Sequence, residues 1–236
     1  MDLRNARRTT PSTREFTDDP LPDDVLYDIL DDARFAPNGG NRQGWHVIIV
    51  RDPASKARIA QLYDLGMREY AAHSAAGLVP FVASEAFKRN PPGGSYRPAV
   101  DLDAARQVPL PSGFPQYLAD APVLLVLTLD LSTISAVDSG LDRLSISTGA
   151  SVYPFAHNVL LAARDRGYGG HLTSVLSRQE PALRTLLHIP PTQVLATMLP
   201  LGRPTREITK LRRLAVEEFT TRETADGPAF GAPDQQ

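Results

Sequence analysis

A continuous apolar run at residues 122–129, with the sequence PVLLVLTL, constrains the fold more than any other feature of this chain. Successive side chains of a strand point to opposite faces of a sheet. A strand in which nearly every side chain is apolar is therefore covered on both faces, which is typical of a central strand. The run predicts a sheet with helices packed on it.

Apolar spacing predicts the other regular elements. Residues that recur every three or four positions predict helices at residues 22–36, 54–76, 145–166 and 177–187. Ser177 and Glu180 have the spacing of a capping box that would open the last of these helices. Short apolar runs predict further strands at residues 45–50 and 193–201, after the turn at 167–170 and around 216–219. This order indicates an α+β fold, with a mixed sheet of about five strands flanked by helices.

Residues 77–120 interrupt the regular pattern with many prolines and with the aromatic residues Phe81, Phe87, Tyr96, Phe114 and Tyr117. Loops of this length are uncommon in compact domains unless they are functional or disordered. The aromatic residues favour an ordered lid over a flexible linker. We therefore expect a single domain over residues 1–224 that contains this insert, followed by a flexible tail at residues 225–236.

Two interpretations of the aromatic residues in the insert stay open. Phe87, Tyr96, Phe114 and Tyr117 could stack on a planar substrate or on nicotinamide. They could equally form a small core of their own that anchors the insert.

Charge and composition exclude several classes of function. The formal net charge of −2 provides no strong field for nucleic acid or for an anionic membrane. No apolar run approaches the ~20 residues of a membrane span, and residues 1–5 lack the apolar stretch of a signal peptide. The absence of cysteine excludes disulfides, thiolate nucleophiles and iron–sulfur clusters. The five histidines show no metal-ligand spacing. We expect a cytoplasmic protein without a metal.

Two basic segments could form a phosphate site. Arg7, Arg8 and Thr9 lie near one end of the chain, and Lys210 and Arg212 lie near the other. If the fold brings them together, they supply bidentate guanidinium groups, an ammonium group and a hydroxyl donor. If it does not, they are two solvated basic patches.

An amide-rich loop, with the sequence APNGGNRQGW at residues 36–45, lies between a predicted helix and a predicted strand. Asn41 and Gln43 each offer a donor and an acceptor on a planar amide, which suits recognition of a flat polar heterocycle. The alternative interpretation is a glycine-rich turn beside a buried Trp45.

These segments occur in one order along nearly the whole chain: RRT at 7–9, the 37–45 block leading into a strand, GYGG at 167–170, LGRP at 201–204 and KLR at 210–212. In that order they resemble the nitroreductase family of FMN flavoproteins, and the 37–45 block is the most specific of them. The resemblance implies an intertwined homodimer with its flavin sites at the subunit interface.

The resemblance also implies roles for individual residues. The residues that resemble the family's phosphate and ribityl group are Arg7, Arg8 and Thr9, with Lys210 and Arg212 closing over the phosphate. Those that resemble the loop reaching the flavin from the partner subunit are Pro37, Asn38, Gly39 and Asn41, braced by Gln43. The turn that directs a backbone amide at flavin N5 corresponds to Gly169 and Gly170, and a contact to the isoalloxazine edge to Ser151. No catalytic side chain is expected, because the flavin carries the redox chemistry.

One departure from the family leaves the phosphate assignment open. The family places an arginine and a serine only a few residues before an aromatic residue. Counting back from Phe16 gives Thr10, Pro11 and Ser12, with no arginine among them. Either Arg7 and Arg8 reach the site through a small insertion, or Ser12 and Arg14 take part.

The implied activity is hydride transfer from NAD(P)H, with NADPH favoured, through FMN to a small aromatic acceptor. Nitroaromatic and quinone-type acceptors and a ping-pong mechanism are expected. Three alternatives stay open: a flavin destructase, a reductive dehalogenase of aromatic substrates, and a non-catalytic protein that binds or stores FMN.

Overall fold

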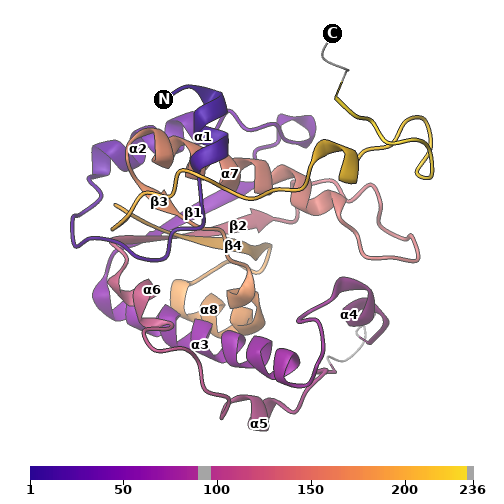
Figure 1. Ribbon diagram of the computed structural model, residues 1–236. Coiled ribbons are helices and arrows are strands. Elements are labelled where there is room, and N and C mark those ends of the chain that lie inside the picture. The colour runs from indigo at the N-terminus through magenta and orange to yellow at the C-terminus, as the bar shows by residue number, and fades with distance from the viewer. Residues whose placement is uncertain (90–96, 233–236) are drawn as a thin grey trace.

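The computed structural model describes residues 1–89 and 97–232, apart from the side chain of Phe87. An antiparallel sheet lies at its centre (Figure 1), in the order β1-β2-β4-β3. Its strands are β1 (Trp45–Val50), β2 (Val123–Asp130), β3 (Gly169–Gly170) and β4 (Gln193–Gly202). Every residue of β2 from Val123 to Leu129 is buried, as the apolar run predicts.

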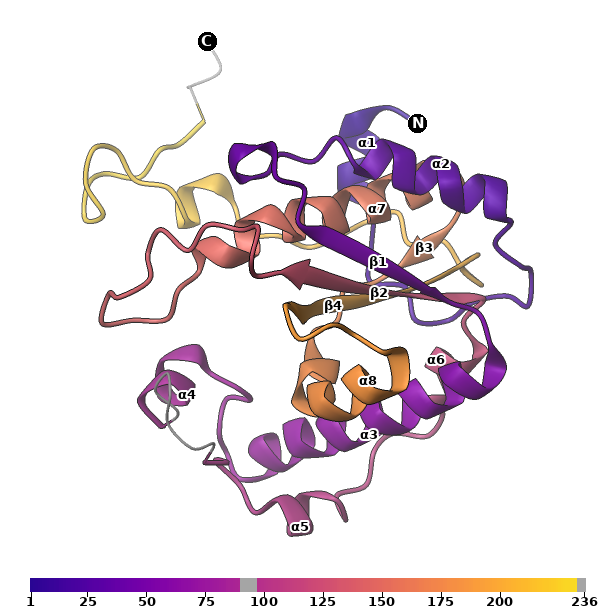
Figure 2. The same cartoon turned by 180° about the vertical axis from the view of Figure 1, so that it is seen from behind.

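Helices cover both faces of the sheet (Figures 1 and 2). One face carries α1 (Leu3–Thr9), α2 (Asp23–Ala33) and α7 (Tyr153–Asp165). The other carries α3 (Pro53–Ala75), α6 (Gln116–Asp120) and α8 (Glu180–Leu187). The alternation of β2 joins the two layers, because Leu125 and Leu127 enter the core under α2 and α7 while Leu124 and Val126 enter the core over α3 and α8.

The described part of the insert contains helices α4 (Ala83–Arg89), α5 (Leu102–Ala105) and α6. Only α6 joins the layer against the sheet, where Leu118 is fully buried. Helix α5 lies on the outer side of α3, away from the sheet, whereas α4 lies beyond the C-terminal end of α3 (Figure 2). None of the helices in the described residues is both long and apolar enough to cross a membrane.

The sheet differs from the prediction in two respects. The described residues form four strands instead of about five, and all of them pair antiparallel. The strand predicted around 216–219 is a short 3-10 helix, η4 (Val216–Glu218). The Glu218 side chain accepts from the Ala215 amide at 2.7 Å and starts this turn, and no described strand lies beside it to pair with.

The helix starts also differ from the prediction. The helix predicted from residue 145 begins as 3-10 helix η2 (Ser147–Ser151) and becomes α7 at Tyr153, because Asp138 accepts from the Ile146 amide at 2.9 Å and holds the preceding loop. Ser177 does not cap α8. It lies in 3-10 helix η3 (Val175–Gln179), and Pro181 starts α8 with its fixed φ and without an amide that needs a cap.

Both terminal segments contain structure beyond the predicted elements. Helix α1 was not predicted, because only Ala6 and Thr9 of its residues are buried and they show no apolar periodicity. Its start is fixed by Asp2, which accepts from the Asn5 amide at 2.9 Å. Near the other end, Thr221 pairs with Ala229 in an isolated bridge. The flexibility of the tail stays a prediction, and residues 233–236 lie outside the described residues.

Candidate functional site

The predicted site residues form two groups at opposite ends of the sheet. Trp45 follows the amide-rich loop and pairs with Leu129, which pairs with Val194 near the start of β4. Gly170 pairs with Leu201 near the end of the same strand. Val194 and Leu201 are seven positions apart, which is about 23 Å along a strand. One chain therefore does not bring the amide-rich loop to the Gly169-Gly170 strand.

The first group is built on the close approach of an N-terminal segment to β3. The Thr13 amide donates to the Gly170 carbonyl at 2.9 Å, and Ser12 pairs with Gly170 in an isolated parallel bridge. A Cβ at Gly170 would lie 2.3 Å from the carbonyl oxygen of Pro200, so glycine is required where the three segments meet.

A pocket of about 210 Å³ opens beside this junction. It is lined by Ser12, Thr13, Arg14, Glu15, Thr205, Arg206 and Ile208. The pocket has two guanidinium groups against the one carboxylate of Glu15, and with two exposed hydroxyl groups it offers the donors that bind a phosphate group. The residues present therefore fit the phosphate end of FMN.

Arg7, Arg8 and Thr9 do not line this pocket. They lie on α1, where the buried Thr9 hydroxyl donates to the Asn5 carbonyl at 2.8 Å and accepts from Arg164 Nε at 3.4 Å. Arg7 and Arg8 are exposed on the same helix. Of the two alternatives that the sequence leaves open, the structure brings Ser12 and Arg14 to the pocket.

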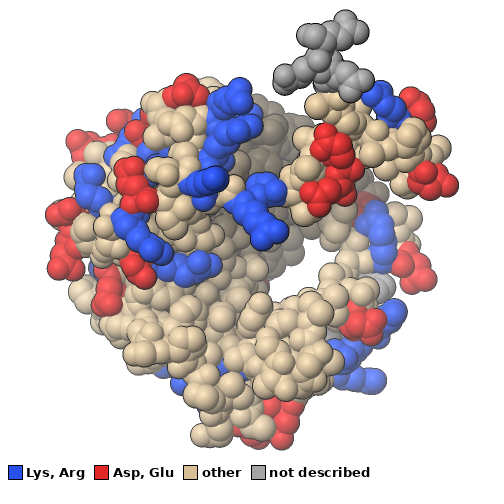
Figure 3. Space-filling model, in the orientation of Figure 1, with Lys and Arg blue, Asp and Glu red and all other residues tan. Residues whose placement is uncertain are grey.

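Lys210 and Arg212 lie on the extended segment that follows Pro204. Ile208 lines the pocket, and Lys210 is two residues further, within about 7 Å of chain. In the part of the chain that the structure describes, neither side chain makes a hydrogen bond or an ion pair. Figure 3 shows Lys and Arg side chains gathered along the upper part of one face, where α1 and this segment run. Both residues thus remain available to an anion.

Aromatic residues form a cluster next to the Gly169-Gly170 strand. Phe114 lies 5.7 Å from Tyr63 and 5.3 Å from Tyr117, measured between ring centroids. Tyr117 lies 5.7 Å from the ring of His171. Both insert residues pack against the core under α3, which is the arrangement of an anchoring core. Phe87 and Tyr96, the other two predicted substrate contacts, lie outside the described residues and side chains.

A buried hydrogen-bond chain runs through this cluster. His171 Nδ1 lies 2.9 Å from the Thr13 carbonyl, and its Nε2 lies 3.3 Å from the Tyr117 hydroxyl. Burial lowers the pKa of His171 to about 4, although the bond to Thr13 opposes the shift. Burial also raises the pKa of Tyr117, and the neighbouring Tyr63 adds to the increase while Arg14 opposes it. His171 is therefore neutral near pH 7, and because a carbonyl only accepts, its proton is on Nδ1.

The second group is the amide-rich loop, which contains a short 3-10 turn, η1 (Gly39–Asn41). Gly40, Asn41 and Gln43 have φ values of 64°, 52° and 51°. Left-handed backbone is uncommon outside glycine and concentrates at functional sites. The Gln43 backbone amide donates to Asn38 Oδ1 at 2.8 Å, and the Gln43 side chain donates to the Asn41 carbonyl at 3.4 Å, so Gln43 links two other residues of this loop.

The loop is also held from outside. The Gly39 amide donates to Ser151 Oγ at 3.4 Å, and Arg42 donates to Ser135. Ser151 thus lies beside the loop and not beside Gly170. Asn41 and Pro37 are exposed at this end of the sheet, so both are accessible to a partner. Trp45 stacks on Phe155 with a centroid distance of 4.9 Å and is half-buried, so it packs against the edge of the core instead of being fully buried.

Sequence reasoning missed three residues of the first group. Thr205 and Arg206 line the pocket, yet within the basic run at 203–213 the family resemblance points only to Lys210 and Arg212. His171 follows the predicted glycine turn, and nothing in its sequence context marks the bond to Tyr117, which is 54 positions away.

Comparisons with known proteins agree with this architecture. The sequence profile of the Nitroreductase family matches residues 6–203. A chloronitrobenzene nitroreductase of Comamonas testosteroni is 26% identical over 231 residues, which cover 93% of this chain and 95% of that protein. The iodotyrosine deiodinase 1 of Mus musculus is 26% identical over 220 residues, which cover 92% of this chain and 67% of that protein. The solved NADPH:FMN oxidoreductase of Vibrio harveyi shares the fold, with a TM-score of 0.63 and 17% identity over 93% of this chain and 76% of that one.

Proposed function

The chain belongs to the nitroreductase family, and from this membership we propose that it is an FMN-dependent oxidoreductase. It would move hydride from NADPH or NADH, with NADPH favoured, to nitroaromatic or quinone-type acceptors in a ping-pong cycle. When bound, FMN accepts and donates hydride at N5, and the protein supplies binding and orientation. The names of the matched nitroreductase and NADPH:FMN oxidoreductase support this class of chemistry.

The pocket beside β3 carries the proposal. Arg14 and Arg206 would neutralise the FMN phosphate, and the Ser12 and Thr205 hydroxyl groups would donate to its oxygens. Lys210 and Arg212 would close over it from the extended segment. The backbone of Gly169 and Gly170 continues from this pocket towards the sheet, in line with the amide contact to the flavin that the family resemblance implies. Arg7, Arg8 and Thr9 are not assigned to the phosphate.

We infer that the complete site needs a second copy of the chain. The amide-rich loop lies about 23 Å along β4 from Gly170, so its Pro37, Asn38, Gly39 and Asn41 would reach the flavin bound by the partner. Loop and C-terminal residues support such an interface, because Val137 is 85% exposed and Ile146, Leu214 and Phe219 are also exposed. Exposed large apolar groups of this kind mark surfaces that a partner covers. Figure 3 shows the molecule open beside α4 on this side.

The visible spectrum of the purified protein tests the proposal. We expect a flavin spectrum that bleaches on anaerobic addition of NADPH or NADH and returns when a nitroaromatic compound is added. A flavin spectrum that neither nucleotide bleaches would favour a storage protein. Loss of the flavin with formation of a benzimidazole would favour a destructase. A colourless protein that FMN does not reconstitute would overturn the proposal.

A second candidate function rests on the similarity to iodotyrosine deiodinase 1, which extends over 92% of this chain. A reductive dehalogenase would release halide from a halogenated phenol under anaerobic conditions when the bound flavin is reduced. The same protein sample with 3-iodotyrosine and with a nitroaromatic compound separates the two activities. We expect nitro reduction to be the faster one, because the acidic lid motif expected of the dehalogenases is not found in the insert.

A further inference from the structure

Thr13 connects the two residues by which the N-terminal segment lines the pocket beside β3. It is buried, whereas its neighbours Ser12 and Arg14 are exposed and line the pocket, as expected where successive side chains alternate. The Thr13 amide donates to the Gly170 carbonyl at 2.9 Å. A Cβ at Gly169 would lie 2.7 Å from Thr13 Oγ1, so the Thr13 side chain packs directly on the glycine backbone. The placement of Ser12 and Arg14 thus depends on how Thr13 is held.

The carbonyl of Thr13 is held by a buried imidazole. It accepts from His171 Nδ1 at 2.9 Å, and His171 is 2% exposed. A neutral imidazole with its proton on Nδ1 only accepts at Nε2. Because the Tyr117 hydroxyl lies 3.3 Å from Nε2, it donates there. Tyr117 therefore orients the imidazole that holds Thr13.

The Tyr117 hydroxyl is itself held by a second tyrosine, which is buried. The Tyr63 hydroxyl lies 3.4 Å from that of Tyr117 and accepts from the Thr173 hydroxyl at 3.3 Å. Since the single hydroxyl proton of Tyr117 goes to His171, Tyr63 donates to Tyr117. The donors thus follow one another in a single direction, and we call these five residues the hydrogen-bond chain: Thr173, Tyr63, Tyr117, His171 and Thr13.

Arg14 also faces this chain directly. Burial raises the pKa of Tyr117 and lowers that of His171, and the charge of Arg14 lowers both. A charge has such an effect only when it lies close to the titrating groups. The hydrogen-bond chain therefore reaches a cation of the pocket by two routes, through the Thr13 backbone and at the Arg14 guanidinium.

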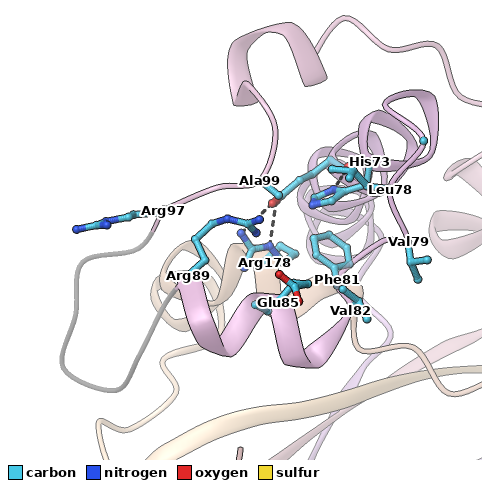
Figure 4. A pocket seen from close by; sticks show the side chains of 13 residues that line it. His73, Leu78, Val79, Phe81, Val82, Glu85, Arg89, Arg97, Ala99 and Arg178 are labelled. Atoms are coloured by element: carbon cyan, nitrogen blue, oxygen red, sulfur yellow. Dashed lines mark hydrogen bonds and ion pairs between the residues drawn. The ribbon is translucent and has the colours of Figure 1, made fainter. Parts of the chain in front are cut away.

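A different contact between the insert and α3 lies further from the pocket. Figure 4 shows Phe81 beside His73 near the end of α3, with 4.9 Å between the ring centroids. His73 comes ten positions after Tyr63 on α3, which is about 15 Å along the helix. Helix α6, which carries Tyr117, and not α4 therefore connects the insert to the pocket.

We propose that Tyr117 and His171 are positioning residues for the phosphate of FMN. Through Thr13 they hold Ser12 and Arg14 where these side chains meet the phosphate, so the insert sets the affinity for that end of the flavin. This inference rests on the proposed function. Neither Tyr117 nor His171 lines the pocket, so both act through the residues that do.

Fluorescence titrations of the flavin-free full-length protein with FMN and with riboflavin, which lacks the phosphate, test the proposal. The wild type should bind FMN more tightly than riboflavin. Tyr117→Phe keeps the ring against Tyr63 and removes one neutral hydrogen bond. It should weaken FMN about fivefold and leave the riboflavin affinity unchanged. A variant that is merely destabilised would not change the ratio of the two affinities.

Leu118→Val is the matched control. Leu118 follows Tyr117 on α6, is fully buried and lies outside the hydrogen-bond chain. Its replacement removes one carbon from the core and should leave the ratio of FMN to riboflavin affinity at the wild-type value. Circular dichroism checks that each variant is folded.

Two replacements of His171 test the same contact independently. His171→Leu removes the donor to Thr13 and should weaken FMN at least as much as Tyr117→Phe does. His171→Asn keeps an amide donor near the position of Nδ1 and should recover most of the FMN affinity. Equal losses in the leucine and asparagine variants would contradict a role in holding Thr13.

The proposal is overturned if Tyr117→Phe leaves the ratio unchanged or weakens both flavins equally. It is also overturned if the wild type binds the two flavins equally well, and the flavin chemistry of the proposed function then still stands. A wild type that binds neither flavin overturns the proposed function. NMR titration with inorganic phosphate, followed at the guanidinium signals of Arg14 and Arg206, then decides on the positioning. Phosphate binding that Tyr117→Phe weakens about fivefold would support it, and unchanged or absent binding would overturn it.

Discussion

The Tyr117 hydroxyl lies 3.3 Å from His171 Nε2, and this contact joins the insert to the residue that follows the Gly169-Gly170 strand. His171 carries the connection onward, because its Nδ1 donates to the Thr13 carbonyl at 2.9 Å. The Thr13 amide in turn donates to Gly170. The insert, the N-terminal segment and the proposed flavin turn are therefore linked through one buried imidazole.

Replacement of Tyr117 by phenylalanine should destabilise the protein by about 1–3 kcal/mol, since it leaves the buried His171 Nε2 without a donor. Urea unfolding monitored by circular dichroism measures the change. Tyr27→Phe is the matched control, because Tyr27 is 70% exposed on α2. Equal stability of the two variants would show that the Tyr117 contact contributes nothing.

Stability should fall with decreasing pH between about 6.5 and about 4 because of His171. In that range the unfolded chain binds a proton at this ring that the folded chain does not, so the free energy of unfolding decreases by up to about 3 kcal/mol. Above pH 6.5 neither state is protonated and the ring adds no pH dependence.

Urea unfolding across this range, for the wild type and for His171→Gln, measures the effect of the imidazole. The variant should lose most of the slope, whereas His157→Gln, at an exposed position of α7, should keep it. An NMR titration that found His171 protonated at pH 6 would contradict the prediction.

Arg14→Gln and Arg206→Gln should each weaken FMN retention about tenfold or more, because each removes a charge-assisted contact to the phosphate. Flavin content after extensive dialysis and the dissociation constant for added FMN measure the loss. Arg7→Gln should retain full flavin, since Arg7 lies on α1 outside the pocket. The opposite ranking of the Arg7 and Arg14 variants would restore the first of the two assignments that the sequence leaves open.

Mixing two impaired variants, assayed at an FMN concentration at which each alone has little activity, should restore part of the activity if the site is shared between subunits. Asn41→Ala would damage the loop that reaches into the partner, and Arg14→Gln would damage the pocket of its own chain. In a dimer of one copy of each, one of the two sites combines an intact loop with an intact pocket. Random pairing makes about half of the dimers mixed, and each mixed dimer has one intact site of its two. Co-refolded mixtures should therefore recover up to about a quarter of the activity of the same amount of wild-type protein. Mixtures no more active than either variant would indicate a site within one chain.

The layered fold could be predicted from local sequence. The run at 122–129 is apolar at positions that point to both faces, so it requires helices on both sides wherever it lies. Trp45–Val50 and Gln193–Gly202 have similarly strong patterns and form strands as predicted. The strand predicted around 216–219 depended on two apolar residues, and with Glu218 capping a turn the local signal favoured a 3-10 helix.

The candidate site was predictable only in part. The sequence by itself determined the family, the central strand and the amide-rich loop, because these depend on residue types at fixed local spacings. Tertiary structure alone decided that Ser12 and Arg14 join Arg206, that His171 meets Tyr117, and that Asn41 lies at the far end of the sheet from Gly170. Each of these relationships joins positions far apart in the chain. Strand order and register set them, and no local pattern of side chains encodes either.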